Sequence, residues 1–151
     1  MVSQATYNSL FARLDSVELL SLRDITVESD SSVGYYASVA IGSDNNPVIS
    51  HYDATNLAVR VYVCANTICS SGTERTVDST GGRTSIAIGN DSNPVIAYAL
   101  GVFICADTIC SIGAAQGVAM SDYKSTAIGA NGAPVVAYND NLDLKVFTCG
   151  N

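Results

Sequence analysis

Residues 85–96 read Ser-Ile-Ala-Ile-Gly-Asn-Asp-Ser-Asn-Pro-Val-Ile, and this stretch decides the fold because two other parts of the chain repeat it. Residues 38–49 read Ser-Val-Ala-Ile-Gly-Ser-Asp-Asn-Asn-Pro-Val-Ile, and residues 125–136 read Ser-Thr-Ala-Ile-Gly-Ala-Asn-Gly-Ala-Pro-Val-Val. The spacing from glycine to proline is the same in all three copies. Internal repetition of this kind indicates one supersecondary unit used three times.

Each copy divides into short strands separated by turn residues. The first strand is a short run of small and β-branched residues such as 85–88, and it ends at a glycine followed by Asp or Asn, which are turn formers. Proline then opens the second strand, where its missing N–H does little harm. The expected second strands are residues 48–52, 95–98 and 135–138; the third are 57–64, 102–105 and 142–149; and the fourth are 75–77 and 116–118.

Four short antiparallel strands per copy are typical of a β-propeller blade, so the sequence predicts an all-β protein with three such blades. A segment over residues 1–23 lies outside the repeats, and apolar residues at helical spacing, among them Leu10, Leu14 and Val17, predict a short amphipathic helix there. This helix either caps apolar surface or recognises a partner. The half-propeller covers residues 24–151, with an outer strand and loop at 24–36, blade 1 at 37–83, blade 2 at 84–123 and an incomplete blade 3 at 124–151.

The third copy reaches Cys149-Gly150-Asn151 without a fourth strand, whereas the N-terminal part carries a spare one. Residues 25–29, Ile-Thr-Val-Glu-Ser, resemble residues 75–79, Arg-Thr-Val-Asp-Ser. Propellers have ~4–8 blades, so the simplest prediction is a two-fold homodimer with a six-bladed ring, in which strand 25–29 of each chain completes blade 3 of the other. A fragment of a longer propeller and a ring with another number of subunits are the alternatives.

The charge balance disfavours one class of partner. The chain has 7 basic and 14 acidic residues and a net charge of −7, whereas nucleic-acid binding needs clustered Lys and Arg. No apolar stretch approaches the ~20 residues of a membrane span. The first residues lack the basic region and apolar core of a signal peptide. We expect no cofactor.

Two cysteine pairs occupy the same place in their copies. Cys64 and Cys69, and likewise Cys105 and Cys110, flank the loop between the third and fourth strands. Cysteines across such a hairpin meet disulfide geometry, so disulfides are expected in an oxidising compartment. Zinc is the alternative, but it would require pairs on different blades to converge. Cys149 is the first cysteine of copy three, and Leu19 occupies the aligned position of its partner, so Cys149 should be a free thiol. The paired cysteines favour an extracytoplasmic location.

No catalytic motif is present, and no catalytic residue is assigned. Propeller geometry places the loops after the second and fourth strands on one face. The candidate ligand-binding residues on that face are Tyr36, Arg83, Tyr123, Tyr52, Asp53 and Asp140. Tyr36, Arg83 and Tyr123 hold equivalent positions and would form a rim around a channel mouth, although loop aromatics also pack between blades. Tyrosine and arginine are effective recognition residues.

Two further side-chain types admit a functional and a structural interpretation. His51 aligns with Tyr98 and Tyr138, so it is either a ring at a position that accepts rings or a catalytic base. The recurring Asp44 and Asp91 either stabilise turns or bind calcium, which needs several converging oxygens.

The pattern Ser-Ile-Ala-Ile-Gly-x-Asp-x-x-Pro-Val-Ile-x-Tyr, followed by Val-x-x-Cys and Thr-x-Cys-Ser, resembles a repeat found in tandem in large bacterial β-propeller proteins of unassigned function. The resemblance covers about residues 24–151 and implies propeller architecture, often outside the cytoplasm, without an activity. Copy two departs from it through a shortened loop at Tyr98-Ala99-Leu100-Gly101, and copy three lacks its second cysteine.

The first functional hypothesis is a non-catalytic binding or scaffold module that assembles as a ring and takes carbohydrate or peptide on its loop face. The second is a hydrolase or lyase in which Asp53, Asp122 and Asp140 converge at the channel mouth with raised pKa values. The third is a structural, self-assembling half-propeller without a small-molecule ligand.

Overall fold

The computed structural model describes residues 3–5, 23–30, 32–117, 120 and 123–149, and this part of the chain is all-β. Eleven strands form three antiparallel sheets, one for each sequence copy. The first sheet contains β1 (Tyr35–Ile41), β2 (Pro47–Asp53), β3 (Ala58–Cys64) and β4 (Gly72–Asp78). The second contains β5 (Ser85–Ile88), β6 (Pro94–Tyr98), β7 (Gly101–Cys105) and β8 (Gly113–Gln116). The third contains β9 (Lys124–Ile128), β10 (Pro134–Asp140) and β11 (Asp143–Thr148).

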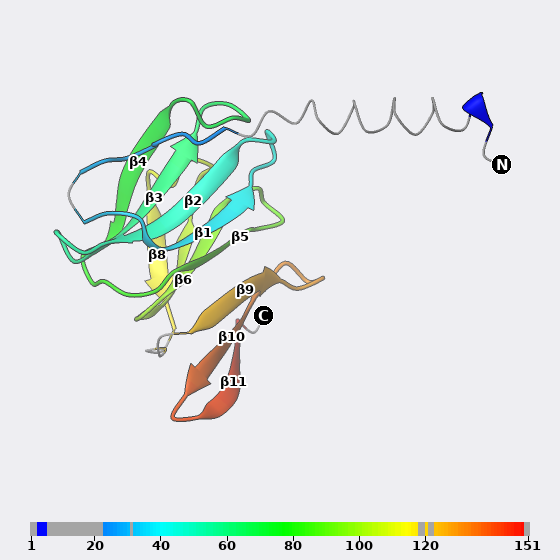
Figure 1. Cartoon of the computed structure of the whole chain (residues 1–151). Coiled ribbons are helices and arrows are strands. Elements are labelled where there is room, and N and C mark those ends of the chain that lie inside the picture. The colour runs from blue at the N-terminus through cyan, green and yellow to red at the C-terminus, as the bar shows by residue number, and fades with distance from the viewer. Residues whose placement is uncertain (1–2, 6–22, 31, 118–119, 121–122, 150–151) are drawn as a thin grey trace.

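The strands of each sheet follow one another in sequence order, and the sheets stand next to each other in the order first, second, third (Figure 1). Their first strands are neighbours, and equivalent hydrogen bonds join them. The N–H of Ile86 donates to Oγ of Ser38 at 3.2 Å, and the N–H of Thr126 donates to Oγ of Ser85 at 2.9 Å. The repeat in the sequence is therefore also a repeat in how one sheet meets the next.

The turn between the first two strands is the same in each sheet. Gly42 donates its N–H to the carbonyl of Asn46, and the Oδ1 of Asp44 accepts the N–H of Asn46 at 3.0 Å. Asp91 bonds to Asn93 in the same way in the second sheet. The side chain satisfies a backbone group that the turn leaves unpaired. The structural interpretation of Asp44 and Asp91 thus accounts for both residues.

Two apolar layers hold the sheets together. Between the first and second sheets, Val48, Val59 and Val61 pack against Ile86, Ile96 and Tyr98. Between the second and third, Val95, Ala97 and Val102 pack against Val136, with Met120 beside them. The second sheet is therefore covered on both faces, which explains why all of β6 is buried. Alternating β-branched residues on short strands produce this two-faced burial.

Three expectations differ from the structure. The fourth strand of copy two, expected at 116–118, runs from Gly113 to Gln116, because Gly113 pairs with Cys105 where the disulfide hairpin closes. Residues 25–29 form no strand in this structure. The three sheets form an open array among the described residues, with no closed ring.

Most of the expected N-terminal helix lies outside the described residues. Among the residues that are described, Gln4 and Ala5 alone are helical. No helix in the part of the chain described above has the length and apolarity needed to cross a membrane.

Candidate functional site

Four side chains that the sequence analysis singled out lie in one stack. The guanidinium carbon of Arg83 lies 4.2 Å from the ring centre of Tyr36 and 4.3 Å from that of Tyr123. The ring of Tyr36 is nearly parallel to that of Tyr52, with an interplanar angle of 14° and centres 6.3 Å apart. Contacts of an arginine with two ring faces are favourable electrostatically. We call the set Tyr52, Tyr36, Arg83 and Tyr123 the aromatic stack.

Local backbone geometry positions Tyr36. Its φ of 54° lies in the left-handed region, at a break in the register between β1 and β2. Such a conformation is costly for a residue with a bulky side chain and persists only where surrounding contacts fix it. The hydroxyl of Thr84 supplies one such contact by donating to the carbonyl of Tyr36 at 3.0 Å.

Two hollows adjoin the aromatic stack. The larger, of about 500 Å³, is lined by Tyr36, Tyr52, Arg83 and the loop that follows β4, including Ser79 and Thr80. The smaller, of about 180 Å³, is lined by Tyr36, Arg83, Thr84, Tyr123 and Lys124. Both lie at the ends of strands from neighbouring sheets, on the face that the sequence analysis assigned to ligand binding.

The two predicted acids of the site have other partners. Asp53 is fully buried, and its carboxylate lies 2.7 Å from Nη2 of Arg60. It also accepts hydrogen bonds from the side chain and backbone of Asn56, and these bonds lower its pKa. The equivalent Asp140 is paired with Lys145. The structure therefore places both acids in ion pairs within their hairpins rather than in the aromatic stack.

A lowered pKa is the opposite of what a general acid near neutral pH needs. The hydrolase hypothesis receives no support from Asp53, and Asp122 lies outside the described residues.

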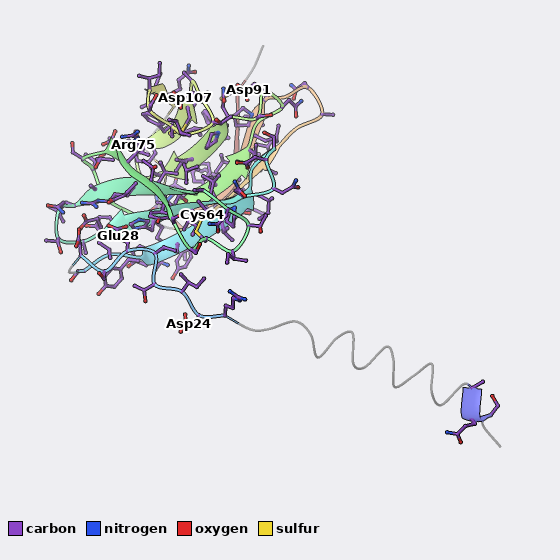
Figure 2. The ribbon with its side chains drawn as sticks, turned by 90° about the horizontal axis from the view of Figure 1, so that it is seen from above. Asp24, Glu28, Cys64, Arg75, Asp91 and Asp107 are labelled. Atoms are coloured by element: carbon purple, nitrogen blue, oxygen red, sulfur yellow. A yellow bond between two sulfur atoms is a disulfide. The ribbon has the colours of Figure 1, made fainter. Side chains whose placement is uncertain are left out.

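A second polar cluster lies where the N-terminal segment crosses the first sheet. The Oε2 of Glu28, a residue labelled in Figure 2, is 2.9 Å from Nε2 of His51, and its Oε1 is 2.9 Å from Nη1 of Arg60. Glu74 is also paired with Arg60. The N–H of Gly34 donates to Nδ1 of His51, so the neutral imidazole carries its proton on Nε2, the nitrogen that lies beside Glu28.

Burial of this cluster shifts the pKa values of its members. Burial raises the pKa of Glu28 and lowers that of His51. Each shift disfavours the charged form of the group, as desolvation does. This environment supports the interpretation of His51 as a packed ring, because its Nδ1 accepts the N–H of Gly34 and its Nε2 lies 2.9 Å from the Glu28 carboxylate.

The same contact recurs between the first and second sheets. The hydroxyl of Tyr98, which aligns with His51, donates to Oδ2 of Asp78 at 3.0 Å, and Asp78 aligns with Glu28. Burial, together with Asp78, raises the pKa of Tyr98 to about 12. Glu28 and Asp78 thus each contact the ring at the equivalent position of the sheet beside them.

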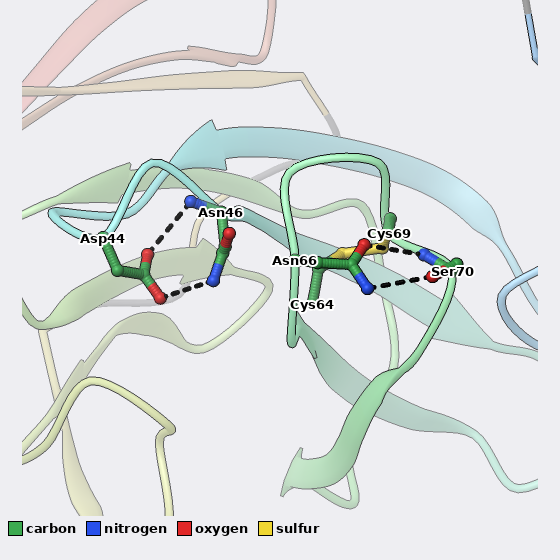
Figure 3. Close-up of a disulfide and its surroundings, with 6 residues drawn as sticks. All are labelled: Asp44, Asn46, Cys64, Asn66, Cys69 and Ser70. Carbon is green, nitrogen blue, oxygen red and sulfur yellow. Dashed lines mark hydrogen bonds between the residues drawn. A yellow bond between two sulfur atoms is a disulfide. The ribbon is translucent and has the colours of Figure 1, made fainter.

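The cysteine pairs Cys64–Cys69 and Cys105–Cys110 form disulfides with Cα–Cα distances of 4.9 Å, which confirms the expected pairing. Figure 3 shows the first of these hairpins, where Oδ1 of Asn66 accepts the N–H of Ser70 at 3.1 Å. Cys149 is a half-buried free thiol. Within the described residues, no group of three or more His, Cys, Asp or Glu side chains could hold a metal ion.

The four residues of the aromatic stack are among the candidates that the sequence analysis named, whereas it did not find the ion-pair network around Arg60. The signal was present, because Asp53 and Asp140 occupy matching places in hairpins that also carry Arg60 and Lys145. The shortened hairpin of copy two has glycine at the position of the cation. Comparisons with family models, with curated proteins and with solved structures find no match to this chain.

Proposed function

We propose that this protein is a non-catalytic binding module that works as a ring: two copies close into a six-bladed β-propeller and present the aromatic stack on the loop face. In each half of the ring, residues 25–29 become the fourth strand of the partner's third sheet. The observation that carries the proposal is the equivalence of the Glu28–His51 and Asp78–Tyr98 contacts.

This equivalence matters because Asp78 belongs to the outer strand of a neighbouring sheet. If residues 25–29 sit on the first sheet as β4 sits on the second, then the remaining strands of a preceding sheet should fit beside them. The third sheet has three strands among the described residues, and its β11 pairs only with β10. An unpaired strand edge favours the addition of a strand from another chain.

Exposure at equivalent positions supports the same arrangement. Val61 and Val102 are fully buried between sheets, whereas Val146, at the same position of the third sheet, is 60% exposed. On the opposite face, Ile86 is 6% exposed and its counterpart Val39 is 61% exposed. The two end faces of the array therefore expose the residue types that the internal interfaces bury. Because each end face repeats one side of an internal interface, the two end faces should fit each other.

The ligand face follows from the same ring. Tyr36, at the start of β1, is equivalent to Arg83 and Tyr123, which precede β5 and β9, so closing the ring would place six such residues around its axis. Partly exposed tyrosine rings beside an arginine form recognition surfaces for carbohydrate or peptide.

The assembly is tested by light scattering coupled to size-exclusion chromatography. The proposal predicts a mass near 31 kDa, twice the 15.7 kDa of the chain. Leu144 is 83% exposed on the end face of the third sheet, so Leu144→Asp should convert the dimer to a folded monomer.

Ile112→Asp is the matched control, because Ile112 is 67% exposed on the hairpin of the second sheet, which already has both neighbours. This variant should leave the mass near 31 kDa. A wild-type mass of 15.7 kDa, or equal masses for Leu144→Asp and wild type, would contradict the ring.

A further inference from the structure

The surface around Arg83 is basic and polar in a chain that is acidic overall. The chain has 7 basic residues against 14 acidic ones, and two of the basic ones, Arg83 and Lys124, line the smaller hollow. No acidic side chain lines either of the two hollows among the described residues. Two basic side chains that line one surface hollow favour an anionic ligand there.

The aromatic stack restricts the shape of that anion. The guanidinium carbon of Arg83 lies over the ring of Tyr36 and over the ring of Tyr123, so both rings contact the guanidinium. No carboxylate of the described residues forms an ion pair with Arg83. A planar carboxylate accepts two parallel hydrogen bonds from the edge of an arginine.

The larger hollow supplies what a sugar ring needs beside that carboxylate. Its volume of about 500 Å³ suits a small ligand, and its lining combines Tyr36 and Tyr52 with Ser79 and with Thr80, whose hydroxyl donates to Asp78 and can still accept a hydrogen bond. Hydroxyl groups and backbone of a glycine-containing loop match the many hydroxyls of a saccharide. A peptide would instead use main-chain pairing along a strand edge.

We infer that the aromatic stack binds an acidic saccharide, with a uronate carboxylate on the edge of Arg83 near Lys124 and the adjoining sugar in the larger hollow. This inference deepens the proposed binding function and rests on it for the biological setting. The site itself consists of residues of a single chain.

The experiment is isothermal titration of the full chain with an oligogalacturonate, its methyl ester and hexaglutamate as probes. The inference predicts binding of the oligogalacturonate alone. Arg83→Gln should weaken that binding by roughly 10-fold or more, since a charge-assisted bidentate contact is lost. Arg83→Lys keeps the charge but loses the planar guanidinium. Its affinity for the oligogalacturonate should therefore lie between that of the wild type and that of Arg83→Gln.

Arg75→Gln is the matched control, because Arg75 is an exposed arginine on β4 outside both hollows (Figure 2). It should leave the affinity unchanged. Equal binding of the ester, equal or tighter binding of hexaglutamate, no binding of the oligogalacturonate, or an unchanged affinity in Arg83→Gln would overturn the inference.

Light scattering on the same samples separates this result from the assembly. Arg83→Gln should keep the wild-type mass. Binding to a 15.7 kDa chain would leave the ligand inference intact and reject the ring. A dimer that binds none of the probes would support the ring and reject the ligand inference.

Discussion

Val61, Val102 and Val146 occupy the same position in the three copies of the repeat but differ in burial. Replacing each by alanine shows how burial at this position affects the free energy of unfolding. Val61 packs against the second sheet and Val102 against the third, both with no exposed surface, whereas Val146 is 60% exposed. The change removes two methyl-sized groups, a transfer free energy of about 1.6 kcal/mol at ~0.8 kcal/mol each. A cavity term brings the cost at the two buried sites to roughly 2–3 kcal/mol.

The cost at Val146 depends on assembly. In an isolated chain, substitution of a side chain that is mostly in water should cost at most about 0.5 kcal/mol. In the ring, Val146 is covered by the first sheet of the partner. Val146→Ala should then lower the free energy of unfolding by roughly as much as the substitutions at the two buried valines. The stability of the wild type should then also rise with protein concentration.

The assay is urea unfolding followed by circular dichroism at two protein concentrations that differ by at least tenfold. We expect all three variants to lose comparable free energy of unfolding at the higher concentration. A loss at Val146 that stays near zero while the wild type unfolds independently of concentration would refute the reasoning. A small loss at Val61 would refute the assignment of the core itself.

Further perturbations test the interactions within the chain. Arg60→Ala should cost roughly 3–5 kcal/mol in urea unfolding, because it leaves carboxylates of a buried cluster without their cation; wild-type stability would contradict this. Replacing Cys64 and Cys69 by alanine should cost about 2 kcal/mol, the value for closing so short a loop, and a neutral result would remove the disulfide from the account. Hydrogen bonds from Ser111 lower the pKa of Asp107. The contribution of this carboxylate to the free energy of unfolding is therefore present above pH ~4 and lost as the pH falls below that value. The melting temperature of Asp107→Asn should consequently fall less on acidification than that of the wild type.

Much of the fold is predictable because the sequence repeats itself. The glycine-to-proline spacing predicted a turn at the same place in each copy, and the prolines at 47, 94 and 134 each begin a strand. Alternation at Val59, Val61 and Val63 predicted β3 to within a residue. These signals are local, so neighbouring residues alone are enough to produce them.

The rest depends on contacts between segments far apart in sequence. From the sequence, Asp53 was a candidate to face a ligand, because it lies in a loop at the end of a strand. In the structure its carboxylate contacts Arg60 and Asn56 instead. The strand expected over residues 25–29 is absent because a strand needs a partner to pair with, and β11 of the same chain is two sheets away. Alignment of Glu28 with Asp78 was the only sequence signal for its contact with a ring on the first sheet.

One cross-link tests the exchange of residues 25–29 most directly. In the first sheet Arg60 pairs with Thr76, and the repeat aligns these residues with Lys145 and Thr26. In a Cys149→Ser background, Thr26→Cys with Lys145→Cys should oxidise to a species of twice the chain mass on a non-reducing gel, because paired strands meet disulfide geometry. Within one chain the second sheet separates the two positions. A product that stays at 15.7 kDa under oxidation would contradict the exchange.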